Sequence, residues 1–375
     1  MKITVRNTCR DHDSYRAARV KSLFNVESGA DFSLDADLPI DGNDWQIGVV
    51  VGPSGSGKTS IGRQLGALYA PAWPADAPII DAIAPRGDVN AAFGALSAVG
   101  LGSVPAWLRP FQVLSNGEQF RANLARLVCD APGFAVVDEF SSVVDRQIAK
   151  VGAGAFSKAW RRTGGKVVLL SCHYDILDWI QPDWIFDTGS GQFERGRLRR
   201  RPPLDMCIHQ TDWQHWPAFE PHHYLKMPRM IAATNYVATI DDQLVAHVAV
   251  STRPGLVEAR ACRLVVMPEW QGAGVGMRFL NAVCQAWLEG QNRYGLQLRT
   301  LFHTSHPGLA AALWRDRSWT QVSAELVGGR KGPCRESMAR SAQKAGGKGN
   351  GGSGYGGHFR AVQGFRYLGE AACAS

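Results

Sequence analysis

The residues with the clearest chemical potential form one glycine-rich run, Gly52-Pro53-Ser54-Gly55-Ser56-Gly57-Lys58-Thr59, continued by Ser60. The run fits the phosphate-binding pattern G-x-x-x-x-G-K-[ST], in which glycines let backbone N–H groups wrap phosphate oxygens. The apolar segment 46–51 predicts a strand before it, and segment 60–69 predicts a helix after it, whose N-terminus favours anions. We therefore expect residues 52–60 to bind ATP, with Lys58 at the β- and γ-phosphates and Thr59 on Mg²⁺.

Two acidic residues follow the next apolar segment, 134–137, which predicts a buried strand. Asp138 would reach the metal from the end of this strand, and Glu139 would polarise the water that attacks the phosphate. A third apolar segment at 166–170 predicts another strand. The alternation of strands and helices indicates an α/β sheet with its ligands at the strand ends.

Between these motifs stands Leu114-Ser115-Asn116-Gly117-Glu118-Gln119, which resembles the signature of ABC ATPases. The resemblance extends to Asp145, where the D-loop belongs, and to His173, which is similar to the histidine that senses the γ-phosphate. It implies a P-loop NTPase fold of the ABC type. It also implies that Ser115 and Gly117 contact the γ-phosphate held by a second chain, in a head-to-tail homodimer with two ATP molecules between its subunits.

The sequence departs from that family at Asn116, at Glu118, which stands where Gln is commoner, and in the interval between Thr59 and Ser115. Asn116 replaces the usual first glycine, a position where Asn can adopt a left-handed backbone. Only 55 residues separate Thr59 from Ser115, and no Q-loop is recognised between them, which argues against a transporter subunit. The aromatic residue that would stack on adenine is best assigned to Phe24.

A second glycine motif, Gln271-x-x-Gly274-x-Gly276, follows the apolar segment 263–267 and opens a predicted helix at 275–288. It resembles motif A of the GNAT acyltransferases, and strands predicted at 243–251 and 296–303 and a helix at 308–319 fit that order. The resemblance implies that backbone N–H groups at the helix start bind the pyrophosphate of acetyl-CoA. The expected CoA-binding residues are Val265, Val266, Met267, Gln271, Gly272, Ala273, Gly274, Val275 and Gly276.

Acyl transfer to an amine needs a general base for the amine and an acid for the leaving thiolate. We assign this role to His223 and Tyr224, because histidine titrates near neutrality. His303, Ser305 and His306 are further candidates, and packing or hydrogen bonding is the alternative role for each of them.

The 375 residues predict two domains, an ABC-type ATPase at 1–200 and a GNAT-like α/β acyltransferase at 201–375. A basic, proline-containing stretch at 195–203 marks the boundary, and the glycine-rich stretch 344–357 predicts a flexible loop. Of the net charge of +8, the second half carries +7, with 19 basic and 12 acidic residues. That charge suits a polyanionic partner, either CoA or nucleic acid.

No secretory segment and no membrane span is predicted, and the eight cysteines form no C-x-x-C pair, so we expect a reducing cytoplasm. The sequence therefore predicts an ATP-hydrolysing ABC ATPase coupled to an acyl-CoA-dependent N-acyltransferase whose acceptor is unknown. The alternative is a nucleic-acid-associated ATPase whose GNAT-like domain binds or modifies bases of DNA or RNA.

Overall fold

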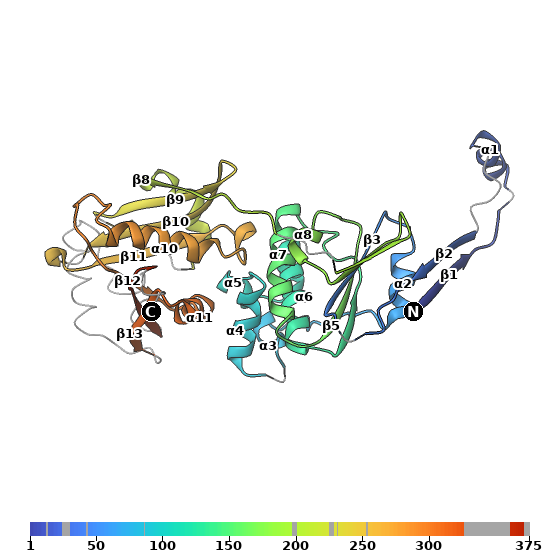
Figure 1. Ribbon diagram of the computed structural model, residues 1–375, viewed down its shortest axis with the longest axis horizontal. Helices are drawn as coiled ribbons and strands as arrows, with labels where there is room; N and C mark the ends of the chain where they lie inside the picture. Colours follow the sequence, from blue (N-terminus) through green and yellow to red (C-terminus); the bar gives the residue numbers. More distant parts are fainter. Residues whose placement is uncertain are drawn as a thin grey trace. The chain divides into compact units, whose positions relative to one another are not determined.

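The computed structural model describes residues 1–12, 14–24, 31–42, 44–85, 87–196, 201–224, 229–230, 232–252, 254–325 and 361–370. The chain forms two compact units: unit 1 comprises 1–72 and 130–202, and unit 2 comprises 73–129 and 203–375 (Figure 1). Segment 73–129, which the sequence assigns to the first domain, thus groups with the second half. The domain bounds 1–200 and 201–375 stay a prediction, and the glycine-rich loop 344–357 lies outside the described residues.

Unit 1 is built on a five-stranded sheet in the order β4-β5-β3-β6-β7. The first four strands are parallel and only β7 pairs in the antiparallel sense. Every residue of the central strand β3 is buried, as its continuous apolar sequence requires. The elements of this sheet and its helices are β3 (Ile47–Val51), α2 (Lys58–Leu65), β4 (Phe134–Val137), α7 (Arg146–Trp160), β5 (Lys166–Ser171), α8 (Leu177–Ile180), β6 (Trp184–Asp187) and β7 (Gln192–Arg195).

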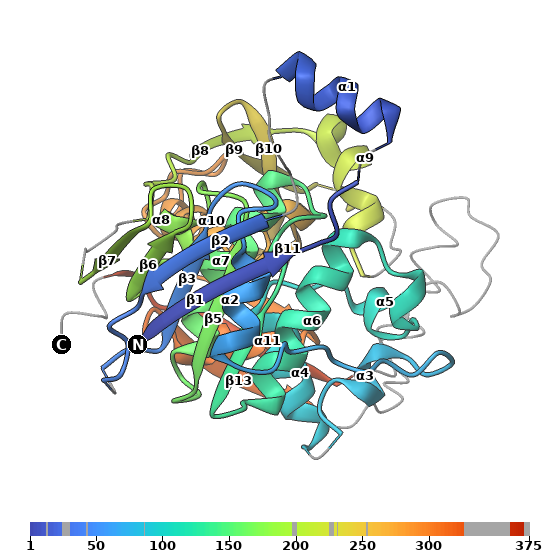
Figure 2. The ribbon, with the colours of Figure 1, turned by 90° about the vertical axis from the view of Figure 1, so that its right-hand side faces the viewer.

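A separate two-stranded ribbon begins unit 1. Strands β1 (Lys2–Thr8) and β2 (Asp31–Asp37) run antiparallel side by side, in register from Lys2 with Asp37 to Thr8 with Asp31 (Figure 2). Helix α1 (Tyr15–Phe24) lies between them in sequence and buries none of its residues. Apolar side chains of the ribbon pack with β3, β5 and β6 in one core, so the ribbon forms part of unit 1.

Unit 2 contains the helical segment 73–129 and a seven-stranded sheet. The helical segment holds α3 (Ile79–Ala82), α4 (Val89–Ala98), α5 (Val104–Trp107), the 3₁₀ turn η1 (Phe111–Val113) and α6 (Asn116–Asp130). Asp88 caps α4 by accepting a hydrogen bond from the Ala91 amide. Helix α6 buries its apolar face through Ala122, Leu124 and Ala125.

The sheet of unit 2 has the order β13-β14-β12-β11-β10-β9-β8 and is antiparallel except between β11 and β12. Its strands are β8 (Cys207–Thr211), β9 (Thr234–Ile240), β10 (Gln243–Thr252), β11 (Ala259–Val266), β12 (Thr300–Thr304), β13 (Trp319–Glu325) and β14 (Val362–Tyr367). Short helical turns η2 (Trp213–His215), α9 (Trp216–Phe219) and η3 (Glu220–His222) follow β8, and η4 (Pro254–Leu256) and η5 (Pro268–Trp270) flank β11.

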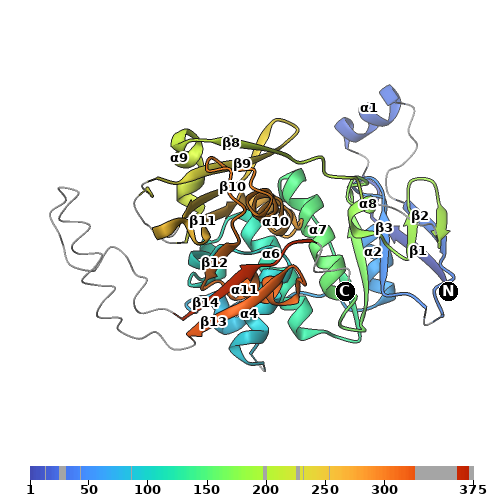
Figure 3. The same cartoon turned by 60° about the vertical axis from the view of Figure 1, so that its left-hand side comes forward.

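Helices α10 (Val275–Leu288) and α11 (Pro307–Arg315) pack on one face of this sheet in a continuous apolar core. The core includes Phe279 and Trp287 of α10, Leu313 of α11 and Tyr367 of β14. Helix α11 also lies beside α4 of the helical segment (Figure 3). The helical segment therefore packs with the sheet and helices of unit 2 as part of the same unit.

The predicted elements agree with the structure where the sequence pattern is local. The strands expected at 46–51, 134–137 and 166–170 are β3, β4 and β5, and the helix expected at 275–288 is α10. Three elements are shorter than predicted: the helix expected at 60–69 spans Lys58–Leu65, the strand expected at 296–303 begins only at Thr300, and the helix expected at 308–319 ends at Arg315. This last helix ends because the Asp316 carboxylate accepts the Ser318 amide, which forms a turn into β13.

Candidate functional site

The loop 52–57 joins β3 to α2 and has the backbone that a phosphate cradle requires. Gly57, the residue before α2, is left-handed at φ 86°, and no side chain caps the helix. A side chain at Gly52 would overlap Thr188, because its Cβ would lie 2.1 Å from the Thr188 hydroxyl oxygen. The first N–H groups of α2 have no carbonyl of their own helix to bond, so they point to an anion site.

Lys58 lies within this loop. Its ammonium group donates to the carbonyl oxygens of Gly52 at 2.8 Å and Pro53 at 2.6 Å. The side chain is therefore held by the same loop that would surround a phosphate. A nucleotide would replace these carbonyls with phosphate oxygens, which are stronger acceptors for an ammonium ion.

The second acidic motif meets the loop directly. The Thr59 hydroxyl donates to the Asp138 carboxylate over 3.2 Å, and that carboxylate also accepts the Glu139 amide at 2.9 Å. Glu139 itself has a left-handed backbone, with φ 49°, which is uncommon for a residue with a side chain. A cavity of about 260 Å³ is lined by Asn7, Ser54, Gly55, Gly57, Lys58, Thr59, Ser60, Asp138, Glu139, Ser142, Leu170 and Cys172.

This set of groups fits ATP with Mg²⁺. The hydroxyl of Thr59 and the carboxylate of Asp138 are hard oxygen donors, which Mg²⁺ prefers, and it commonly completes its shell with water and phosphate oxygens. Among the residues that the structure describes, no three His, Cys, Asp or Glu side chains gather as a metal site.

Two further residues of the predicted ATP site lie in unit 1. Asp145 caps α7, since its carboxylate accepts the amides of Gln147 and Ile148 at 2.8 and 3.3 Å. His173 follows β5, and its amide donates to the Ser171 hydroxyl at 3.0 Å. Burial, and then the positive charge of Arg146, lower the pKa of the His173 imidazole.

Ser115 and Gly117 lie at the start of α6 in unit 2. The Ser115 amide and hydroxyl both donate to the Glu118 carboxylate at 2.9 Å, and the Glu118 amide lies 3.4 Å from the Ser115 hydroxyl oxygen. This reciprocal arrangement is a capping box. Asn116 is the first residue of α6 and is absent from the positive-φ residues, so the left-handed backbone suggested for it does not occur.

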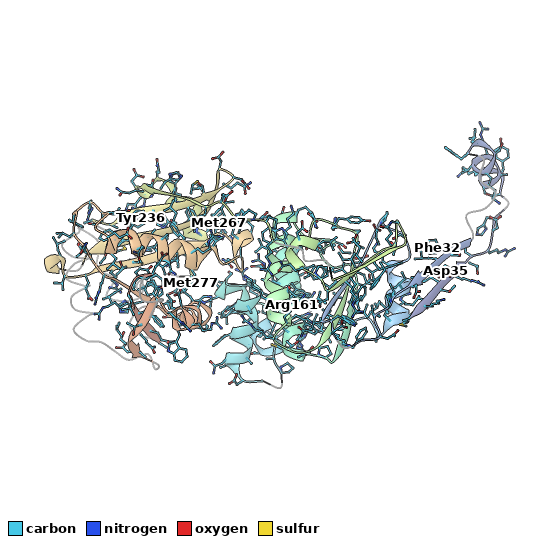
Figure 4. All side chains as sticks on the ribbon, viewed as in Figure 1. Phe32, Asp35, Arg161, Tyr236, Met267 and Met277 are labelled. Atoms are coloured by element: carbon cyan, nitrogen blue, oxygen red, sulfur yellow. The ribbon has the colours of Figure 1, made fainter. Side chains whose placement is uncertain are left out.

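Phe24 does not have the environment of a stacking residue at the phosphate loop. Its side chain is 72% exposed on α1. Phe32 of β2 is the aromatic residue beside the loop, because a Cβ at Gly57 would lie 2.9 Å from its ring, and Figure 4 labels it on the ribbon near Asp35. Sequence reasoning missed Phe32, since strand pairing rather than a motif brings it there.

The second glycine motif forms the connection from β11 to α10. Gly274, the residue before α10, is left-handed at φ 85°, and Gly272 is left-handed at φ 95°. Gly276 lies close to the preceding strand, since a Cβ there would be 2.9 Å from Val266 Cγ2. Figure 4 labels Met267, where the connection begins, and Met277, in the first turn of α10.

The strands next to this connection separate. Strand β11 runs to Val266, but it pairs with β12 only from Ala259 to Ala261. Arg263, just beyond the paired part, is left-handed at φ 58°, at an irregularity in the pairing of β11 with β10. A bulge of this kind bends a strand, so residues 262–266 leave the parallel pair.

His223 and Tyr224 follow the turn η3, beside an aromatic group. The His223 ring lies 5.2 Å from the Tyr224 ring and 5.8 Å from that of Trp216. Trp216 packs in a small apolar cluster with Val265, and Met267 lies against the same cluster. The fold thus brings the two candidate acid–base residues to the cluster that also holds two of the predicted CoA-binding residues.

His247 of β10 is a residue that sequence reasoning missed. It is fully buried, and its ring is surrounded by those of Trp213, Trp216 and Phe219 at 5.0 to 5.8 Å. Its Nδ1 lies 3.3 Å from the Arg263 carbonyl oxygen, while its Nε2 has no hydrogen-bond partner among the described residues. Burial lowers the pKa of His247 to about 4, so the ring is neutral at pH 7.

The remaining acid–base candidates have structural contacts. His306 Nδ1 accepts the Leu309 amide and so caps α11, and its Nε2 lies 3.1 Å from the Gly102 carbonyl oxygen. These partners fix the proton on Nε2, so His306 could accept a substrate proton only by breaking one of the two bonds. His303 is on β12, with Nδ1 buried, and the buried Ser305 hydroxyl has no hydrogen-bond partner within the described residues.

The chain is similar in sequence to a curated protein. The cytochrome c biogenesis ATP-binding export protein CcmA of Rhodospirillum rubrum is 31% identical over 177 residues, which cover 36% of this chain and 75% of CcmA. No protein-family model matches the chain. No helix in the described ranges is both long and apolar enough to cross a membrane.

The similar solved structures include an ATP-binding cassette and an acetyltransferase. The ATP-binding cassette MJ0796, solved as a dimer bound to ADP and Pi, has 14% identity and a TM-score of 0.37, over 52% of this chain and 99% of that one. The ribosomal-protein-S18-alanine N-acetyltransferase of Escherichia coli has 11% identity and a TM-score of 0.31, over 44% of this chain and 93% of that one.

Proposed function

The chain belongs to the ABC ATPases, the family of its relative CcmA, and from that premise we propose that it couples ATP hydrolysis to an acyl-CoA-dependent N-acyltransferase. The observation that carries the ATPase half is the contact of Thr59 with Asp138 at a cavity that Lys58 and Glu139 also line. These are a metal-binding hydroxyl and carboxylate, a cation for the phosphates and a carboxylate for water, in one place.

In this proposal Lys58 and the amides of 52–60 hold the phosphates, and Thr59 and Asp138 hold Mg²⁺. The ion supplies positive charge where negative charge develops on the transferred phosphoryl group. Glu139 orients and polarises the attacking water, and His173 contacts the γ-phosphate. Ser115, Gly117 and Asp145 complete the site of a second chain, so the ATP-bound form is a head-to-tail homodimer.

In unit 2 the connection 265–276 holds acyl-CoA, with the pyrophosphate at the start of α10. The left-handed glycines before α10 and the parting of β11 from β12 support this assignment. The amine nitrogen forms a bond to the thioester carbonyl carbon, the carbon–sulfur bond breaks, and CoA leaves as its thiol. His223 and Tyr224 are the groups proposed to take the proton from the amine and supply one to the sulfur.

Export is the function named for CcmA and is not part of this proposal. The interval between Thr59 and Ser115 is only 55 residues, without a recognised Q-loop. Segment 73–129, which includes most of this interval, groups with the acyltransferase-like sheet in unit 2. That grouping supports a role for the segment toward acyl transfer.

A hydrolysis assay with matched variants tests the ATPase half. Lys58→Ala should reduce ATP hydrolysis by the full-length chain to background, because no other described basic side chain lines the cavity. Arg63→Ala, on the exposed side of the same helix, should retain wild-type hydrolysis. Equal rates for Lys58→Ala and Arg63→Ala would reject the assignment of the ATP site.

A further inference from the structure

Within unit 2, the helical segment 73–129 packs directly on the β11–α10 connection and on the start of α11. Gly308, in the first turn of α11, lies so close to α4 that a Cβ there would be 2.2 Å from the Ser97 hydroxyl oxygen. The Trp107 ring of α5 lies 5.5 Å from the His306 ring at the start of α11. Since these contacts involve three separate helices, the packing is extensive.

The most specific contact comes from Arg121 of α6, which is only 3% exposed. Its Nη1 donates to the carbonyl oxygen of Gly100 at 2.6 Å and to that of Pro268 at 2.7 Å. Pro268 begins the connection that leads to Gln271 and the glycines before α10. One guanidinium group thus joins helix α6, which starts at Asn116, to the predicted CoA loop.

A second pair of hydrogen bonds runs parallel to the first. The Gly102 amide donates to Gln271 Oε1 at 3.0 Å, and Gln271 Nε2 donates to the Val266 carbonyl oxygen at 3.0 Å. Gly100 approaches the same residue, because a Cβ at this left-handed glycine would lie 2.2 Å from the Gln271 carbonyl oxygen. The loop 100–102 therefore fixes the side chain and the backbone at the first residue of the glycine motif.

Arg121 is also incompletely satisfied. Its Nε and Nη2 atoms are buried and have no hydrogen-bond partner among the described residues. Burial lowers its pKa to about 10, against the opposing effect of Glu269 and Glu118, so the group is charged at pH 7. A buried charge with unused donors is costly, and a small movement of α6 or of the connection could give it another acceptor.

We propose that Arg121 is a positioning residue that links nucleotide capture at the start of α6 to acyl-CoA binding by residues 271–276. The inference rests on the proposed function, since it takes both ligands from there. Arg121 lies six residues after Ser115, within the rigid backbone of α6, so a displacement of the helix start moves the guanidinium group with it. Because Arg121 holds the Pro268 carbonyl, the Pro268 carbonyl and the Gln271 backbone N–H bonded to it would move as well. The backbone of the CoA loop would then change its position.

Linkage makes the effect reciprocal: if nucleotide changes the affinity for acyl-CoA by some factor, acyl-CoA changes the affinity for nucleotide by the same factor. The experiment therefore titrates acetyl-CoA into the full-length chain by calorimetry, with and without Mg²⁺ and the non-hydrolysable analogue AMPPNP. The ratio of the two Kd values measures the coupling. For the wild type we expect a change of about fivefold or more.

Three variants make the test specific. Arg121→Met fills the same space without the donors, so both ligands should bind but the Kd ratio should fall to about 1. Arg121→Lys, which retains a cationic donor, should restore part of the coupling. Asn123→Ala is the matched control, because Asn123 lies on the same helix and accepts the Trp73 indole N–H within the helical segment; its Kd ratio should equal that of the wild type.

If Arg121→Met does not fold, Gly100→Ala is a second variant that breaks the same contact region. Its new Cβ must separate loop 100–102 from Gln271. It should lower the Kd ratio while nucleotide still binds. Binding of both ligands to the wild type with a Kd ratio of 1, or an unchanged ratio in Arg121→Met or in Gly100→Ala, would overturn the coupling and leave the proposed function intact. Failure of acetyl-CoA to bind the wild type under either condition would instead overturn the proposed function.

Discussion

Helix α2 of unit 1 and helix α10 of unit 2 begin in the same way, but different side chains surround their N-termini. Each follows a strand and a short loop, and each is preceded by a left-handed glycine, Gly57 at φ 86° and Gly274 at φ 85°. Neither start has a capping side chain. Both therefore present free backbone N–H groups, which is a general solution for binding a phosphate group.

The two starts differ in the chemistry around them. The loop before α2 carries Lys58 and Thr59 and faces the carboxylates of Asp138 and Glu139. The connection before α10 carries no charged side chain from Gln271 to Gly276 and is held by Gln271 and Arg121 instead. In the proposed function, the first start has the groups to break a phosphate bond, whereas the second has only groups to hold a phosphate while another part of the ligand reacts.

The largest expected effect tests the hydrolytic side of this comparison. Glu139→Gln removes the carboxylate that would polarise water but keeps the shape of the side chain. ATP hydrolysis should fall roughly 100- to 10,000-fold, while ATP binding is retained. Light scattering after gel filtration in ATP and Mg²⁺ should show a stable dimer of the full-length chain. A monomer at saturating ATP would contradict the head-to-tail arrangement.

The next effect tests the holding side. Gly276→Leu places a bulky side chain where even a Cβ would be 2.9 Å from Val266 Cγ2. The start of α10 must then shift away from the strand, and the loss of one hydrogen bond to the charged pyrophosphate, about 1.5–3 kcal/mol, should raise the Kd for acetyl-CoA roughly tenfold or more. The affinity for ATP should not change. Gly94→Leu is the control, because nothing lies within 4 Å of a Cβ at Gly94; equal effects of the two substitutions would contradict the assignment.

A third prediction concerns the pH dependence of the free energy of unfolding, which should reveal the burial of His247 among aromatic rings in unit 2. The pKa of His247 is lowered from 6.5 to about 4, so between these values the unfolded chain binds the proton and the folded chain does not. The free energy of unfolding should therefore rise by about 3 kcal/mol as the pH increases through that window. His247→Phe should lose this component, which urea denaturation at pH 4.5 and pH 7 would measure. Identical pH dependence in both proteins would show that His247 titrates normally.

The smallest effect concerns the cap of α7 in unit 1. Asp145→Ala leaves the Gln147 and Ile148 amides without their acceptor and should reduce the free energy of unfolding by about 1 kcal/mol. Asp145→Asn keeps a capping oxygen and should restore that stability. If Asp145 also acts on ATP across a dimer, Asp145→Asn should remain slower in hydrolysis than the wild type; equal rates would restrict the residue to capping.

The features that the sequence predicts well are local ones. The phosphate loop, strands β3 to β5 and helix α10 follow from apolar runs and glycine spacing, which need no knowledge of the tertiary structure. The Ser115–Glu118 capping box is also local, because the pattern S-x-x-E is visible in the sequence within the ABC signature. His247 is also visible locally, because it is a polar residue within the otherwise apolar run 243–251, which suggests a buried histidine.

The features that sequence reasoning missed depend on long-range packing. Nothing local in 73–129 indicates that this segment groups with residues far along the chain, and Arg121 looks like any arginine on an amphipathic helix. Its role depends on two carbonyl groups, one of them 147 positions away in sequence. Phe32 reaches the phosphate loop only through the pairing of β2 with β1. Such contacts are set by topology, which a single sequence specifies only weakly.

The central claim is that one chain carries two separate phosphate-binding helix starts, one for ATP and one for acyl-CoA. Calorimetric titration of acetyl-CoA into the full-length wild type, Lys58→Ala and Gly276→Leu tests it most directly, because CoA contains an adenosine diphosphate that could also enter the ATP site. We predict one acetyl-CoA per chain with the same affinity in the wild type and Lys58→Ala, and much weaker binding in Gly276→Leu. Loss of acetyl-CoA binding in Lys58→Ala but not in Gly276→Leu, or no binding to the wild type, would contradict the claim.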